Sequence, residues 1–128
     1  MSLFHPFTLP DAGTEQMQAA LEKYTGYAKS DQFPTFGDYE GWLGADLMIK
    51  GIEGAGSNPA RAGVITALRG IKAYNGNGIL PITIDYATVF GHLSPQCVWL
   101  FKAEKSGFSL VQKDDVCGKE IPGTSTAG

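Results

Sequence analysis

The chain has 128 residues, a net charge of −3 at pH 7 and a hydrophobic fraction of 43%. A chain of this length forms one compact domain and would bury roughly two thirds of the surface that the unfolded chain exposes. Basic residues are not clustered, which argues against nucleic-acid partners and anionic membrane surfaces. No stretch approaches the roughly 18 apolar residues that a membrane helix requires.

Two helices separated by a loop are expected in the first part of the chain. Apolar residues at helical spacing predict a helix over residues 14–25, which Asp11 or Thr14 would cap and Gly26 would end. Residues 29–37 are rich in turn formers. A second helix is expected over residues 39–53, apolar on nearly all sides, with a polar edge that contains Asp46 and Lys50. Its repeated glycines require the close approach of another helix or strand as compensation.

The second part of the chain predicts a helix, an edge strand and a hairpin. Asn58 and Pro59 favour a third helix from this point to about residue 72, followed by a turn over residues 74–78. Alternating apolar residues over 79–86 predict a strand, in which Pro81 fits either at a sheet edge or among the first residues of the strand. Residues 97–103 and 108–113 predict a hairpin whose loop contains Gly107. We therefore expect the α/β class, and we expect residues 118–128 to pack loosely.

The chain has two cysteines, Cys97 and Cys117, both close to the predicted hairpin. Continued pairing of the hairpin strands sets Cys97 opposite residue 114 or 115. A bend just before Cys117 would then bring the two sulfurs together, so a disulfide is predicted within the unit 97–117. A disulfide is typical of the periplasm or the cell exterior, whereas two buried thiols would be typical of a cytosolic protein.

The sequence contains no established catalytic or cofactor motif. His5 and His92 lie in predicted loops without a nucleophile and a carboxylate at catalytic spacing, and Asp114–Asp115 reads as solvated charge. Residues 76–78 lack the third glycine and the preceding strand of a dinucleotide site. We predict no catalytic residues, no metal site and no cofactor. An enzyme would require a cluster of titratable groups in a closed pocket.

Three stretches carry a resemblance to a known family: DYEGWLGADLMIKGIEGAGSNPARAGVITALRGI, GNGILPITIDY and CVWLFKAEKSGFSLV. Together they resemble the C-terminal region of type I periplasmic binding proteins of the branched-chain amino acid receptor family. In that family a tyrosine opens a long helix that carries small residues at set positions, which correspond here to Tyr39, Ala45, Gly51, Gly54, Ala55 and Gly56. The next helix ends in an Ala-Leu-Arg pattern, here residues 67–69. The resemblance covers residues 14–113.

The resemblance implies a partial type I periplasmic-binding-protein fold with three helices, one edge strand and a C-terminal β-hairpin. Family members are two-lobed and far longer, so residues 1–128 are expected to be a single fragment that carries elements of both lobes. The implied function is capture of a small amino-acid-like solute and its delivery to the membrane subunits of an ABC importer. The implied location of the exported parent protein is the periplasm or the cell exterior.

The same resemblance places ligand contacts in the loop before the second helix. Phe36 is expected to form an apolar wall, and Tyr39 to present its hydroxyl at the rim of the cleft. Thr35 and Asp38 would add polar contacts there. The alternative for Phe36 and Tyr39 is packing in the core or at a hinge, and the alternative for Asp38 is a capping role at the start of the helix.

A second hypothesis is a stand-alone sensing or regulatory module that works as a homodimer. Apolar residues of the second helix and of the hairpin would supply its interface. A fragment that carries parts of two lobes would expose the same apolar faces, so self-association is expected.

Overall fold

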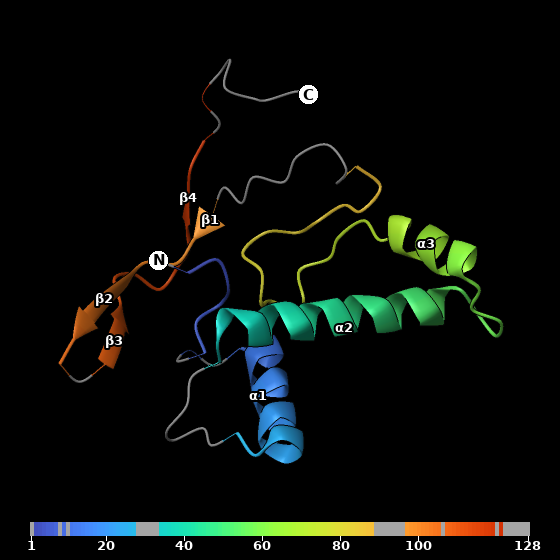
Figure 1. Cartoon of the computed structure of the whole chain (residues 1–128). Coiled ribbons are helices and arrows are strands. Elements are labelled where there is room, and N and C mark those ends of the chain that lie inside the picture. Colours follow the sequence, from blue (N-terminus) through green and yellow to red (C-terminus); the bar gives the residue numbers. More distant parts are fainter. Residues whose placement is uncertain are drawn as a thin grey trace.

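The computed structural model describes residues 2–7, 9, 11–27, 34–88, 97–105, 107–119 and 121. Within these residues lie three helices followed by four short antiparallel strands, shown in Figure 1. This arrangement confirms the predicted mixed α/β class. His92 and most of the loop 29–37 lie outside the described residues, as does most of the tail 118–128.

Helix α1 (Ala12–Thr25) begins and ends at the residues that local chemistry favours. Asp11 is the N-cap, and its side chain accepts a hydrogen bond of 2.9 Å from the backbone N–H of Gly13. Gly26 ends the helix in the left-handed conformation, with φ of 72°. The helix therefore starts two residues earlier than expected and stops where it was predicted to stop.

Helix α2 (Phe36–Gly54) is long and runs from above α1 to below α3 in Figure 1. Thr35 is its N-cap and forms a capping box with Asp38, which satisfies two backbone donors at once. Capping by Thr35 explains why the helix starts three residues before the predicted Tyr39. Asp38 takes part in the cap but is not the N-cap itself.

Helix α3 (Arg61–Arg69) is shorter than predicted and packs back onto the C-terminal half of α2. The expected start at Asn58 and Pro59 is wrong, because residues 55–58 form the turn that reverses the chain. Gly56 in this turn has φ of 80°, and Ala60 precedes the helix without a side-chain cap. The reversal required by tertiary packing has overridden the capping preference of Asn58.

The glycines of α2 divide into two groups. A Cβ atom added at Gly51 would lie 2.9 Å from Leu68 Cγ, and one at Gly54 would lie 2.9 Å from Ala67 Cβ. These two glycines therefore allow α3 to approach, and for Gly51 this is the compensation that the sequence predicted. The same prediction is wrong for Gly41 and Gly44, because no described atom lies within 4 Å of a Cβ added there.

The strand predicted over residues 79–86 does not form. The segment makes one isolated antiparallel bridge, between Tyr74 and Ile84, and the described residues around it lie in turns and irregular chain. Tyr86 N–H donates to Ile71 O at 2.9 Å, which holds the segment to the end of α3. Pro81 has no backbone donor, so a continuous ladder through it is unfavourable.

The strands form two small antiparallel sheets. β2 (Phe101–Glu104) and β3 (Gly107–Leu110) make the predicted hairpin, whereas β1 (Cys97–Val98) pairs with β4 (Val116–Cys117). Continued β2–β3 register would face Cys97 with Asp114, but the observed partner is Cys117, so the pairing shifts by three residues. The residues between β3 and β4 bulge out to absorb this shift, which is the bend that the sequence required.

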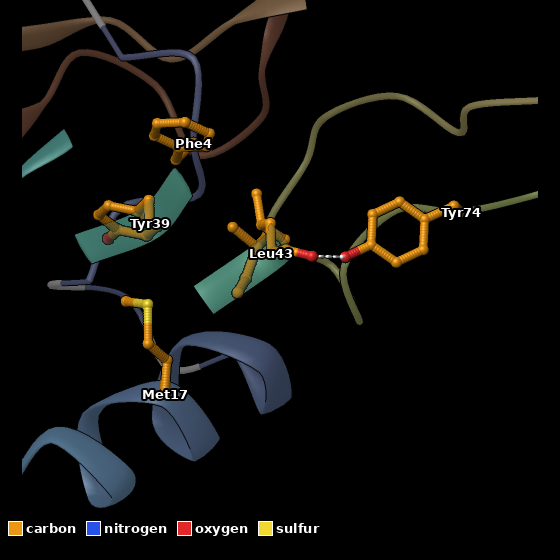
Figure 2. Packing of buried hydrophobic residues seen from close by; sticks show 6 residues of the cluster. Phe4, Met17, Tyr39, Leu43 and Tyr74 are labelled. Atoms are coloured by element: carbon orange, nitrogen blue, oxygen red, sulfur yellow. Dashed lines mark hydrogen bonds between the residues drawn. The ribbon is translucent and has the colours of Figure 1, made fainter. Parts of the chain in front are cut away.

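Among the described residues, a buried cluster joins the N-terminal segment, α1, α2 and the turn after α3. Figure 2 shows how its side chains lie around α2. The buried cluster consists of Phe4, Met17, Tyr39, Leu43, Tyr74 and Ile79. Ser2 also makes a bridge with Trp99, which ties the start of the chain to the region of β1.

Much of α2 lies outside this core. Met48 and Ile49 are each 55% exposed and Ile52 is 39% exposed, so the prediction of a helix buried on nearly all sides is wrong for the chain by itself. Among the described residues, none of the helices has the length and apolarity to cross a membrane.

Candidate functional site

The four residues predicted to contact ligand all lie at the N-terminus of α2. Thr35 precedes the helix, and Phe36, Asp38 and Tyr39 occupy its first turn. The structure therefore brings them together, as their closeness in the sequence requires. Their side chains point to different environments, and each is described in turn.

Thr35 and Asp38 satisfy one another. Asp38 Oδ2 accepts hydrogen bonds from the Thr35 backbone N–H at 2.7 Å and from the Thr35 hydroxyl at 2.8 Å. These bonds, the backbone one first, stabilise the charged carboxylate and lower the pKa of Asp38 below its usual value. The Asp38 carboxylate is thus ionised at neutral pH and keeps unused acceptor capacity for a ligand.

Tyr39 is buried in the core rather than placed at a rim. Its ring stacks on Phe4 with centroids 4.8 Å apart and planes 7° apart, and its hydroxyl donates to the carbonyl of His5 at 3.2 Å. Burial, with a smaller contribution from nearby Tyr27, raises the pKa of Tyr39 to about 12. The hydroxyl proton is therefore held in the hydrogen bond to His5 in the N-terminal segment.

Phe36 is the exposed aromatic ring of this group. It is 55% exposed, and its ring centroid lies 5.0 Å from that of Phe4. Phe4 contacts the rings of both Phe36 and Tyr39, so the position of Phe36 is supported from the core side. An exposed ring on a rigid support is suited to contact an apolar ligand group.

A hollow beside α2 was not predicted from the sequence. It has a volume of about 440 Å³, and its wall includes Trp42, Asp46, Lys50, Tyr74 and Asn75. Asp46 and Lys50 form an ion pair of 3.5 Å. The polar edge of the second helix pointed to these two residues, but the opposite wall comes from the turn after α3, which no local pattern places there.

A second hollow of about 420 Å³ lies between the N-terminal segment and the region after β3. Its wall includes His5, Trp99, Lys113, Asp114 and Asp115. His5 Nδ1 is buried without a hydrogen-bond partner, and its ring meets Trp99 edge-on at 5.2 Å. The histidine has no nucleophile beside it in this wall.

Comparison with known proteins decides the family. The family model described as periplasmic binding protein matches residues 1–108. The chain belongs to the periplasmic binding protein family. This match confirms the type I branched-chain amino acid receptor family expected from the sequence. No curated protein and no solved structure matches the chain.

Membership of the periplasmic binding protein family gives the chain a general role. Proteins of this family are solute-binding receptors located outside the cytoplasm, and they are normally not enzymes. Such receptors bind ligand through a few fixed polar groups and an apolar wall.

The cysteines of this periplasmic binding protein form the predicted disulfide, Cys97–Cys117. The bond connects directly paired residues of β1 and β4. Cys117 Sγ lies 3.3 Å from Asp115 Oδ2, but a sulfur in a disulfide carries no proton to donate. The cluster Cys97, Asp115 and Cys117 therefore cannot serve as a thiolate metal site while the disulfide is intact.

Proposed function

We propose that this chain is part of an extracytoplasmic receptor that binds a small amino-acid-like solute and presents it to the membrane subunits of an ABC importer. The observation that carries the proposal is the family match over residues 1–108. In this proposal residues 1–128 carry elements of both receptor lobes, and closure of the lobes around the solute gives the transport-competent form.

The N-terminus of α2 is the proposed ligand-contacting part of this chain. Phe36 supplies an apolar wall because its ring is exposed and is supported by Phe4. The Asp38 carboxylate is ionised and suits the ammonium group of an amino acid, and the Thr35 oxygen lies beside it. Tyr39 contributes by fixing the helix to the N-terminal segment through His5.

Binding without turnover is part of the proposal. The two hollows described above are open, and neither is lined by a nucleophile next to a general base. We therefore propose that the solute leaves the receptor chemically unchanged. The disulfide Cys97–Cys117 supports a location in the periplasm or at the cell exterior.

The test is a calorimetric titration of the intact receptor that contains this chain with a panel of L-amino acids. Phe36→Ala should weaken binding of the best ligand about tenfold, because an apolar wall contact of roughly 1.4 kcal/mol is lost. Phe108→Ala is the matched control, since Phe108 is a similarly exposed ring, 62%, on the distant strand β3. Equal loss in both variants, or no loss in either, would contradict the role of Phe36.

A second candidate is a stand-alone sensing module that works as a homodimer. The observation that favours it is the run of exposed apolar residues on α2, namely Met48, Ile49 and Ile52. Ile65 of α3 is also 37% exposed. A dimer of this chain that binds ligand by itself would support the module, and ligand binding only by the intact receptor would support the transport function.

A further inference from the structure

The hollow beside α2 is formed by segments far apart in the chain. Trp42, Asp46 and Lys50 come from successive turns of α2, whereas Tyr74 and Asn75 come from the turn that follows α3. None of the four residues at the N-terminus of α2 lines it. It is therefore a separate concave surface from the one described under the proposed function.

The turn that forms one wall of the hollow is held tightly in place. A Cβ atom at Gly76 would overlap Leu43 Cδ2, and one at Gly13 would lie 2.6 Å from the carbonyl oxygen of Asn77. Asn77 has φ of 58°, a conformation that asparagine tolerates better than most residues. Backbone atoms of α1 and a side chain of α2 thus fix the turn before any ligand arrives, which reduces the entropy lost on binding.

The polar groups of the hollow offer both donors and acceptors and carry no net charge. Asp46 and Lys50 lie 3.5 Å apart and cancel each other, and Asn75 adds an amide that both donates and accepts. The hydroxyl of Tyr74 donates to the carbonyl of Leu43 at 3.2 Å, as the dashed line in Figure 2 marks, so it can only accept a bond from a ligand.

Tyr74 keeps its hydroxyl proton at neutral pH. Burial raises the pKa of Tyr74 above its ordinary value, and the nearby negative charge of Asp46 raises it further. The hydroxyl oxygen therefore stays neutral, and the wall keeps its balance of charge.

We propose that this hollow binds a monosaccharide, with Trp42 as the apolar wall and Asp46, Lys50 and Asn75 as hydrogen-bonding groups. Each sugar hydroxyl can both donate and accept a hydrogen bond. Sugar hydroxyls can therefore pair with the carboxylate of Asp46, the ammonium of Lys50 and the amide of Asn75. A sugar ring also has an apolar C–H face that packs on an aromatic ring. An anion would be repelled by Asp46, and a cation would be repelled by Lys50. An apolar ligand would leave the polar groups of the wall without hydrogen-bond partners.

The two tryptophans allow a test with an internal control. The chain labelled with ¹⁵N is titrated with D-glucose, D-galactose and D-ribose, and the two indole N–H resonances are followed. The Trp42 resonance should shift saturably with at least one sugar. The Trp99 resonance should not move, because Trp99 is 5% exposed and lines the other hollow.

Variants locate the binding. Asp46→Asn should weaken the sugar about tenfold, the usual loss for a hydrogen bond to a charged group. Glu53→Gln removes a carboxylate from the same helix outside the hollow and should leave the affinity unchanged. Trp42→Phe keeps an aromatic wall and should retain weakened binding, with circular dichroism confirming that each variant is folded.

Four results would overturn the proposal. The first three are no saturable shift with any of the three sugars, equal movement of both indole resonances, and equal losses in Asp46→Asn and Glu53→Gln. A shift of Trp42 with L-leucine in place of the sugars would make the hollow a zwitterion site and would also overturn it. The proposed amino-acid function depends on Phe36 and is tested by its own titration. Failure of the sugar proposal can therefore be distinguished from failure of the proposed amino-acid function.

Discussion

At the scale of single residues, Tyr39 shows how one side chain connects the core to the N-terminal segment. Its ring stacks on Phe4 and its hydroxyl reaches the carbonyl of His5, thirty-four residues earlier in the chain. The long α2 helix is thereby anchored at its first turn. The sequence suggested Tyr39 as a ligand contact, whereas in this structure its side chain holds α2 to the N-terminal segment.

Removal of the Tyr39 hydroxyl should have a modest cost at neutral pH. Tyr39→Phe keeps the stacked ring but leaves the His5 carbonyl without its donor, which should lower the free energy of unfolding by about 1 kcal/mol. Urea unfolding at about pH 8 measures this change. The exposed tyrosine Tyr24 provides the control, and Tyr24→Phe should unfold like the wild type.

The same variant should also alter the dependence of stability on alkaline pH. The pKa of Tyr39 is raised to about 12 in the folded chain, whereas an unfolded tyrosine titrates near 10. The stabilisation is therefore complete below about pH 10 and is lost as the pH rises toward 12. Tyr39→Phe should lose less stability than the wild type between about pH 10 and pH 12. An equal loss in both proteins would show that other groups dominate.

At the scale of helices and strands, the close pairing of α2 with α3 depends on two glycines. Gly51 lies against Leu68 and Val64, and Gly54 lies against Ala67. The side chain of Ala67 cannot rotate away, so contact at Gly54 is more demanding than contact at Gly51. The open glycines Gly41 and Gly44 face no such neighbour within the described residues.

Alanine substitutions at the two kinds of glycine should have opposite effects. Gly54→Ala should destabilise the isolated chain by about 1–2 kcal/mol, because the new methyl group pushes α3 away. Gly44→Ala should stabilise it by up to about 1 kcal/mol, because alanine favours the helix and meets nothing. Thermal unfolding of both variants shows whether each substitution raises or lowers the melting temperature. Destabilisation by Gly44→Ala would show that another segment packs on this face.

At the scale of the whole molecule, the C-terminal strands are tied together covalently. The disulfide Cys97–Cys117 links residues 20 apart and holds β1 to β4. Ser2 bridges to Trp99 two residues after Cys97, so the start of the chain depends on the same region. Loss of the bond should therefore loosen both ends of the described fold.

Removal of the disulfide should lower the free energy of unfolding by about 3 kcal/mol, the loop-closure value for a loop of this length. The double variant Cys97→Ala, Cys117→Ala and the reduced wild type should show similar melting temperatures. Addition of a reductant should lower the melting temperature of the wild type and leave the double variant unchanged. A reductant-insensitive wild type would mean that the bond does not form in solution.

The exposed apolar residues on α2 determine how the chain behaves in solution. We expect the isolated chain to self-associate through the surface that contains Met48, Ile49 and Ile52. Ile52→Glu should shift the molar mass measured by light scattering toward that of a monomer. Val111→Glu, at a residue 59% exposed after β3, is the matched control and should leave the mass unchanged. A wild-type monomer would contradict this expectation.

Features encoded by near neighbours in the chain were predictable. The end of α1 at Gly26, the Gly107 hairpin turn and the need for a neighbouring helix or strand against Gly51 follow from residues within one or two turns of each other. The order of elements and the small-residue positions also indicated the family, which the match over residues 1–108 confirms. The Thr35–Tyr39 site was predictable only in its position, and its role as a ligand contact remains a prediction.

Contacts between distant segments determined the rest. Asn58 favours a helix start, yet α3 starts at Arg61 because the chain must first reverse onto α2. Residues 79–86 alternate like a strand, but within the described chain the pairing is limited to the one bridge with Tyr74. The sequence alone predicted the three helices and the disulfide, because short-range backbone preferences and side-chain periodicity are local, and its resemblance to known receptors indicated the family. The tertiary structure decided which apolar faces are buried and where the hollow beside α2 lies, because both depend on segments that only folding brings together.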